Sequence, residues 1–106
     1  MNRERYTIDY LASLPHNGLD AILKPVVFRD AEAPEWFSYS GLWDGRVMER
    51  MHALGFTCEN YMANQHNTAF AQWFKEGFNG TEVVLDDSSL ARVVAIAAIM
   101  AVQEEA

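Results

Sequence analysis

Cysteine is almost absent from this chain, since Cys58 is the only one among 106 residues. A single thiol cannot form a disulfide within the chain or supply a cysteine-based zinc site, and such usage is typical of a reducing cytoplasm. Half of the residues are apolar, so a chain of this length can bury a core without covalent cross-links. We therefore predict one domain that covers residues 1–106.

Long hydrophobic runs are also missing. The uncharged run from Val93 to Val102 has half of the roughly 20 residues that a membrane span needs. The N-terminal segment is interrupted by Asp9, Ser13 and Pro15, so it lacks the continuous apolar region of a signal peptide. We expect a protein that stays in the cytoplasm where it is made, without membrane attachment.

Basic residues are few, with eight Lys and Arg against fifteen Asp and Glu and a formal net charge of −7. Contacts from Lys and Arg to phosphate dominate nucleic-acid affinity, and here the basic residues are scattered singly. The composition therefore argues against direct binding to DNA or RNA. The acidity is explained by solubility alone, or by an acidic surface that meets a basic site on a partner.

The segment LARVVAIAAIMAV, residues 90–102, carries only one charge, Arg92. A helix that is apolar on every side has to be embedded in protein, so we predict a buried C-terminal helix. The preceding DDSS predicts its start, with Asp87 or Ser88 as the N-cap.

A second helix is predicted over residues 40–55, because its apolar residues recur at helical spacing. Ser40 is its expected N-cap and Gly55 its expected left-handed terminator. The apolar stripe consists of Trp43, Val47, Met51 and Leu54.

Two shorter helical segments are predicted towards the N-terminus. The turn signal Asn17–Gly18 precedes apolar residues at helical spacing, and Pro25 ends that helix early because it disfavours helical geometry at Lys24. Residues 1–16 form a candidate N-terminal helical extension that stops at Pro15, and residues 29–38 read as a loop. The apolar residues of the two segments are Ile8, Leu11, Leu14, Leu19, Ile22 and Leu23.

From Phe56 the apolar period changes to two, which is typical of strands. Turn-forming segments separate the three runs FTCENYM, AFAQWF and TEVVL. In the middle run Phe70 and Phe74 alternate with Trp73, so both faces carry apolar bulk and we expect something to cover each face. The predicted fold class is α+β: a three-stranded antiparallel meander packed with about three helices, like an α-β-α sandwich, with the C-terminal helix buried.

No motif for catalysis, cofactor binding or metal binding is evident. The three histidines lack zinc-ligand spacing. Cys58 with His52 could serve as nucleophile and base, but a lone thiol in a strand is usually a small buried hydrophobe. Asp86 and Asp87 could form a carboxylate pair, but their place before a helix explains them as caps. We therefore expect no enzyme activity, no cofactor and no metal.

Two places combine acidic and aromatic residues and are candidate contact surfaces. Trp36 lies in the acidic loop before the second helix, and tryptophan is enriched in interface hot spots. Phe78 stands at the tip of the second turn, where side chains usually face solvent. The candidate partner-binding residues are Asp30, Glu32, Glu35, Trp36, Glu76 and Phe78.

The order of these segments resembles the phage ABA sandwich family, small proteins encoded by bacteriophages and prophages. The resemblance covers roughly residues 18–102 and rests on YSGLWDGRVMERMHALGF, then AQWFKEGF, then LDDSSLARVVAIAAIMA. It implies an antiparallel sheet packed with helices, a phage origin and hence the cytoplasm of a bacterial host. It implies no activity, because the family has no assigned chemistry.

Three functions are carried forward. The first is an accessory protein that binds a host protein or complex and inhibits an antiviral defence, as an anti-CRISPR protein does, by offering acidic and aromatic surface to a basic site. The second is a small ligand-binding domain or enzyme with a cleft beside the sheet, which would bring Cys58, His52 or the aspartates together. The third is a homodimer or larger homo-oligomer that buries surplus apolar surface between copies.

Overall fold

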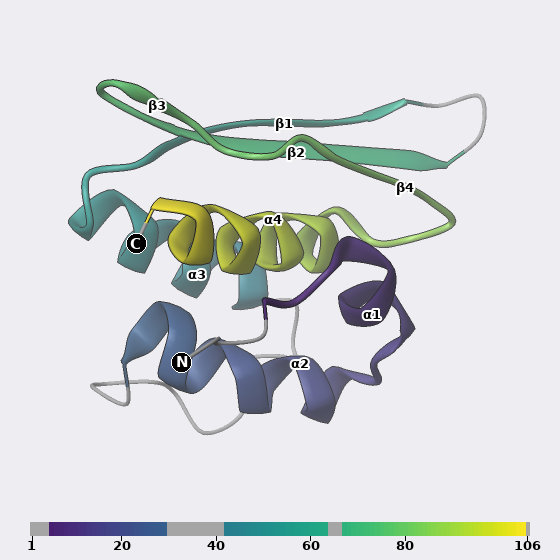
Figure 1. Cartoon of the computed structure of the whole chain (residues 1–106). Helices are drawn as coiled ribbons and strands as arrows, with labels where there is room; N and C mark the ends of the chain where they lie inside the picture. The colour runs from purple at the N-terminus through teal and green to yellow at the C-terminus, as the bar shows by residue number, and fades with distance from the viewer. Residues whose placement is uncertain (1–4, 30–41, 64–66, 106) are drawn as a thin grey trace.

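An antiparallel sheet covers one side of a stack of helices in the computed structural model, which describes residues 5–29, 42–63 and 67–105, with the backbone alone from 42 to 45 (Figure 1). Within these ranges, four α-helices and four strands make an α+β fold, as predicted. In chain order the elements are α1 (Ile8–Ser13), α2 (His16–Leu23), the π-helix η1 (Lys24–Phe28), α3 (Leu42–Ala53), β1 (Thr57–Ala63), β2 (Thr68–Lys75), β3 (Phe78–Asn79), β4 (Val83–Asp86) and α4 (Leu90–Glu105).

Helix α4 lies at the centre of the stack. The sheet covers it on one side, α3 flanks it, and α1 and α2 lie on its far side (Figure 1). Every residue from Val93 to Val102 is buried, and the indole Nε1 of Trp73 in β2 donates to the main-chain oxygen of Val94 at 3.2 Å. The prediction of an embedded C-terminal helix is confirmed.

The start of α4 differs from the prediction by one or two residues. Ser89 Oγ accepts the Arg92 N–H at 3.2 Å, so the N-cap is Ser89, and the prediction of Asp87 or Ser88 is wrong. Asp87 instead turns the chain out of β4, with φ of 55° and its N–H donated to Asn67 O at 3.0 Å.

The sheet is built around β2, which pairs with β1 along one edge and with β3 and β4 along the other. The third strand is split because Gln72 and Trp73 of β2 lie opposite three residues, 80–82, between the pairs that bound them. This extra residue is a β-bulge. Gly80 fits there because a Cβ would lie 2.7 Å from Trp73 O.

The two faces of the sheet have different surroundings. Ala69, Ala71 and Trp73 of β2 are fully buried on the inner face, which is turned towards α4. The helices of the described ranges all lie on that side (Figure 1), so the layers run sheet, helix, helix instead of helix, sheet, helix. At the outer-face positions of β2, Phe70 and Phe74 alternate with the polar residues Thr68 and Gln72. A surface of this kind tolerates contact with water.

The N-terminal helices match the prediction from the sequence only in part. Helix α1 ends at Ser13, before Pro15, as predicted. Helix α2 begins at His16, so Asn17 and Gly18 lie inside it and the prediction that they precede it is wrong. The α-helix does end before Pro25, yet the chain continues as the π-helix η1. A widened turn accommodates a proline that has no N–H to donate.

The C-terminal end of α3 matches the prediction. Val47 and Met51 are fully buried, and Gly55 has φ of 96°. The Gly55 N–H donates to His52 O at 3.0 Å and the Phe56 N–H to Met51 O at 2.9 Å, which is the Schellman arrangement. Ser40 and the side chain of Trp43 lie outside the described residues.

The N-terminal segment is packed against α4 as part of the core. Leu11 is fully buried, and the Arg92 guanidinium donates to Ala12 O and Leu14 O. The side-chain amide of Gln103 binds both backbone groups of Tyr6, accepting its N–H at 3.0 Å and donating to its oxygen at 2.7 Å. Across the described ranges no helix is long and apolar enough to cross a membrane.

Candidate functional site

The outer face of the sheet carries a row of apolar side chains across three strands, in which a partly buried central ring lies between two exposed side chains. Tyr61 of β1 lies opposite Phe70 of β2, and their rings stack with centroids 4.8 Å apart at 24°. Val84 of β4 lies opposite Phe70 on the other side. Tyr61 is 57% exposed and Val84 is 46% exposed. We call these three residues the open-face cluster.

Acidic residues flank the open-face cluster. Glu59 lies two residues before Tyr61 on the same face of β1, and Asp86 lies two residues after Val84 on β4. Both acids are exposed, and Asp86 Oδ1 accepts the hydroxyl proton of Thr68 at 2.7 Å. The outer face thus has an apolar centre with one carboxylate on each side of it.

No lysine or arginine of the four strands lies on this outer face. The one basic strand residue, Lys75, lies on the inner side in register with Phe78. Its Nζ lies 5.0 Å from the centroid of the Phe56 ring and 3.5 Å from Glu105 Oε2. The charged side chains that the four strands place on this outer face are therefore all carboxylates.

Of the six residues proposed from the sequence, the structure describes two, Glu76 and Phe78. Glu76 is exposed in the turn between β2 and β3. Phe78 is half-buried, with its ring edge-on to Phe56 at 6.1 Å and 80°. The expectation that Phe78 is exposed is therefore wrong, because the two-residue turn places it on the inner face opposite Lys75. The other four candidates, Asp30, Glu32, Glu35 and Trp36, lie outside the described residues.

Sequence reasoning missed the open-face cluster. The alternation of β2 shows that Phe70 shares a face with Gln72 and Phe74, but it does not show which face the helices cover. That depends on where α4 packs, which is a long-range property of the fold. Tyr61 and Val84 become recognisable only once the register places both of them beside Phe70.

The residues considered for catalysis have other surroundings. Cys58 is partly buried on the inner face of β1 and its Sγ accepts from Asn60 Nδ2 at 3.5 Å. Burial raises the pKa of this thiol above its ordinary value. His52 is exposed at the end of α3, with its ring edge-on to Trp73 at 6.1 Å. Within the part of the chain that is described, no three His, Cys, Asp or Glu side chains are grouped so that they could hold a metal ion.

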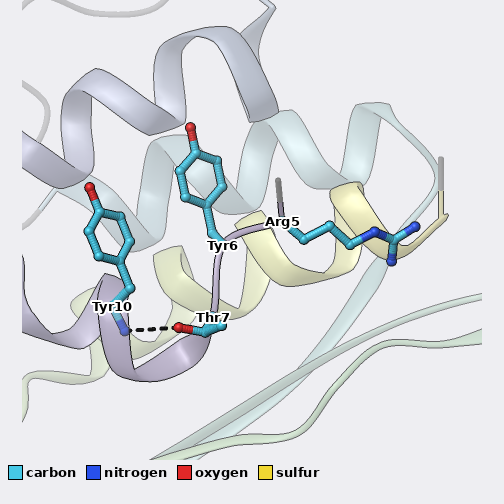
Figure 2. Close-up of a pocket in the computed structure, with 4 residues that line it drawn as sticks. All are labelled: Arg5, Tyr6, Thr7 and Tyr10. Carbon is cyan, nitrogen blue, oxygen red and sulfur yellow. Dashed lines mark hydrogen bonds between the residues drawn. The ribbon is translucent and has the colours of Figure 1, made fainter. Parts of the chain in front are cut away.

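A hollow of about 330 Å³ lies beside α1 and is lined by Arg5, Tyr6, Thr7 and Tyr10 (Figure 2). The Tyr6 and Tyr10 rings stack at 6.1 Å and 12° and their hydroxyl groups point the same way, whereas Arg5 points away from them. Thr7 Oγ1 accepts the Tyr10 N–H as the cap of α1. The described lining offers stacking surface but no set of polar groups that converge on one point.

Comparison of the chain with protein-family models, with curated proteins and with solved structures finds no match. The resemblance to phage ABA sandwich proteins therefore stays a prediction, and so does the phage origin that it implies.

Proposed function

We propose that this protein acts by binding another protein through the outer face of its sheet. The observation that carries the proposal is the contact between the exposed ring of Tyr61 and Phe70, with Val84 alongside. Single exposed apolar residues are ordinary on protein surfaces. Apolar side chains that adjoin one another and have a polar rim mark interaction sites, and tyrosine is enriched in interface hot spots.

The charges indicate the kind of partner. Glu59 and Asp86 flank the cluster, and the strands place no basic side chain on this face. A partner with an apolar centre and Lys or Arg at its rim would be attracted over a distance and held in register. A second copy would bring further carboxylates to the same face, in a chain of net charge −7, so a different, basic partner fits better.

The resemblance to phage proteins extends the proposal to a biological role. We propose an accessory protein that works in the cytoplasm of a bacterial host and inhibits an antiviral defence complex, of which CRISPR complexes are the leading example. The acidic flanks would meet a basic site on that complex. Such sites commonly hold nucleic acid, whose affinity depends on phosphate contacts with Lys and Arg.

An affinity capture tests the binding face. The tagged chain is incubated with lysate of a bacterial host at low and at high salt, and the captured proteins are identified and quantified. We expect a specific partner whose capture decreases at high salt and falls at least tenfold for Tyr61→Ala and for Glu59→Lys.

Tyr10→Ala is the matched control, because Tyr10 is also an exposed tyrosine but lies on α1 beside the hollow. Capture by this variant should equal that by the unchanged chain. If Tyr61→Ala captured the partner fully while Tyr10→Ala did not, the binding surface would be the hollow and the proposal for the sheet would be wrong.

A further inference from the structure

In the part of the chain that the structure describes, strand β1 forms one edge of the sheet and lacks the usual protection against pairing with other chains. Among the described strands it pairs only with β2. Its register runs without a bulge from Thr57 to Ala63, and it contains neither proline nor lysine. Proteins normally protect an edge strand with such features, or by keeping it short. Glu59 is its one charged residue.

The opposite edge of the same sheet does carry this protection. The bulge at residues 80–82 interrupts it, and β4 has only four residues. The backbone N–H and the hydroxyl of Thr81 both donate to the Glu104 carboxylate of α4. These hydrogen bonds attach the bulge to α4. Glu82 and Asp86 are exposed along it. The lack of protection is therefore specific to β1.

The hydrogen-bonding groups on the β1 edge follow from the register. The Gly80 N–H donates to Trp73 O at 2.8 Å, so Trp73 directs its backbone groups towards β3. The N–H and C=O groups of successive residues alternate in direction along a strand. The outer-face residues of β2 therefore direct their backbone groups towards β1, where they pair with the backbone groups of the outer-face residues of β1. The inner-face residues of β1 direct their N–H and C=O groups away from β2. These residues are Cys58, Asn60 and Met62.

We propose that the partner binds as an extended segment that adds a strand to this edge, with a Lys or Arg side chain beside Glu59 and an apolar side chain beside Tyr61. The inference rests on the proposed function and specifies the form of its partner. Strand addition gives affinity through main-chain hydrogen bonds and specificity through alternate side chains. Side chains directly opposite each other on neighbouring strands lie about 5 Å apart, so the added strand would extend the open-face cluster.

Charge favours a basic segment over a second copy of this chain as the occupant. A second β1 would contribute another Glu59 and no cation to a face on which the described strands already place Glu59 and Asp86. A cationic side chain next to Glu59 would instead form the opposite-charge pair that stabilises neighbouring strands.

A peptide probe tests the added strand directly. The probe is the acetylated and amidated peptide TKTVTKT, in which Lys, Val and Lys lie on one face of the strand and the threonines on the other. It is titrated into isotope-labelled protein while backbone amide signals are recorded by NMR. We expect saturable binding with the largest shifts at Cys58, Asn60 and Met62. A peptide with Glu in place of Lys should bind at least tenfold more weakly. Shifts centred on β4, or spread evenly over the acidic surface, would overturn the inference.

Backbone methylation separates strand pairing from charge attraction. Two further peptides carry N-methyl groups either on all threonines or on the valine and both lysines, which removes the hydrogen-bond donors from one peptide edge or the other. One of them should lose at least tenfold in affinity and the other should bind like the parent, and which one loses reports the strand direction. Equal affinity of both methylated peptides would overturn the inference.

Proline in β1 provides the corresponding change in the protein. Asn60→Pro removes an N–H that faces away from β2, a position at which edge strands accept proline. Asn60→Ala loses the same side-chain contacts as Asn60→Pro but keeps the backbone N–H. We expect peptide affinity at least tenfold lower for Asn60→Pro than for Asn60→Ala. If Asn60→Pro fails to fold, Met62→Pro with Met62→Ala provides a second pair, and equal affinities within a folded pair would overturn the inference.

The same variants separate this inference from the proposed function. If Tyr61→Ala loses the captured partner while Asn60→Pro retains it, the outer face binds and strand addition is wrong. If both variants retain the partner, both proposals are wrong. Sedimentation of the chain alone tests the other occupant: a dimer that Asn60→Pro abolishes would show that a second copy takes this edge, which overturns the basic segment.

Discussion

The indole Nε1 of Trp73 donates a hydrogen bond to the main-chain oxygen of Val94 at 3.2 Å, which joins the central strand β2 to the embedded helix α4. Trp73 is fully buried, and Gly80 donates its N–H to the Trp73 backbone oxygen from the bulge. One residue therefore connects the helix, the central strand and the split third strand.

Removal of the Trp73 contacts should destabilise the protein strongly. Trp73→Phe loses the indole donor, and we expect the free energy of unfolding to fall by about 1–3 kcal/mol. Trp73→Ala also leaves a cavity, with an expected loss of about 3–5 kcal/mol. Urea unfolding followed by circular dichroism measures both. Val84→Ala, on the exposed outer face, should stay within about 0.5 kcal/mol of the unchanged chain, and an equal loss there would contradict this assignment of the core.

The N-cap of α4 provides a sharp comparison between two neighbouring serines. Ser89 Oγ accepts the Arg92 N–H, so Ser89→Ala should lower the free energy of unfolding by about 0.5–2 kcal/mol. Ser88 does not accept from the first turn, and its hydroxyl makes a long contact of 3.5 Å with Asp86 O. Ser88→Ala should therefore change stability by less than about 0.5 kcal/mol. The reverse order of the two values would place the cap at Ser88.

The sequence predicts those features of the fold that depend on neighbouring residues, and it does not predict those that depend on contacts between distant segments. The burial of α4 and the positions of the strands come from local hydrophobic patterns, and both are found in the structure. The cap was misplaced because all four residues of DDSS are good N-caps. The direction of Phe78 depends on turn length, and the choice of which face of β2 is covered depends on how α4 packs, so neither follows from local pattern.

The candidate site was less predictable than the fold. Tyr61, Phe70 and Val84 come from three different strands, and no spacing in the sequence brings them together. Glu76 was correctly expected at a turn, but the neighbouring Phe78 packs inward. The predicted meander already places β1 at an edge, but the contrast with the opposite edge depends on the bulge at residues 80–82, which the apolar pattern did not predict.

The bulge at Gly80 should not accept a larger residue without a change in the sheet. A Cβ at this position would lie 2.7 Å from Trp73 O and 3.2 Å from Ala101 Cβ, and both neighbours are held in the core. We expect Gly80→Ala to lower the free energy of unfolding by about 1–3 kcal/mol, as overpacking does. Gly18→Ala is the control: its Cβ would meet the Leu14 side chain at 3.3 Å, while α2 would gain helix propensity of up to about 1 kcal/mol. A larger loss at Gly18 than at Gly80 would contradict the tight packing of the bulge.

The Cys58 thiol should make stability depend on pH in the alkaline range. Burial raises the pKa of Cys58 in the folded protein, so the folded state holds its proton to higher pH than the unfolded state does. Stability from this group is fully present below the pKa of an unfolded cysteine, about 8.5, and is lost as pH rises through the folded pKa. The free energy of unfolding should thus fall more steeply above this pH in the unchanged chain than in Cys58→Ala, which has no thiol to titrate. Alkylation by iodoacetamide, which requires the thiolate, should have its half-maximal rate at a higher pH than that of a cysteine in an unfolded peptide. Parallel unfolding curves for the two proteins, together with an alkylation midpoint at the unfolded value, would show that the thiol is open to solvent.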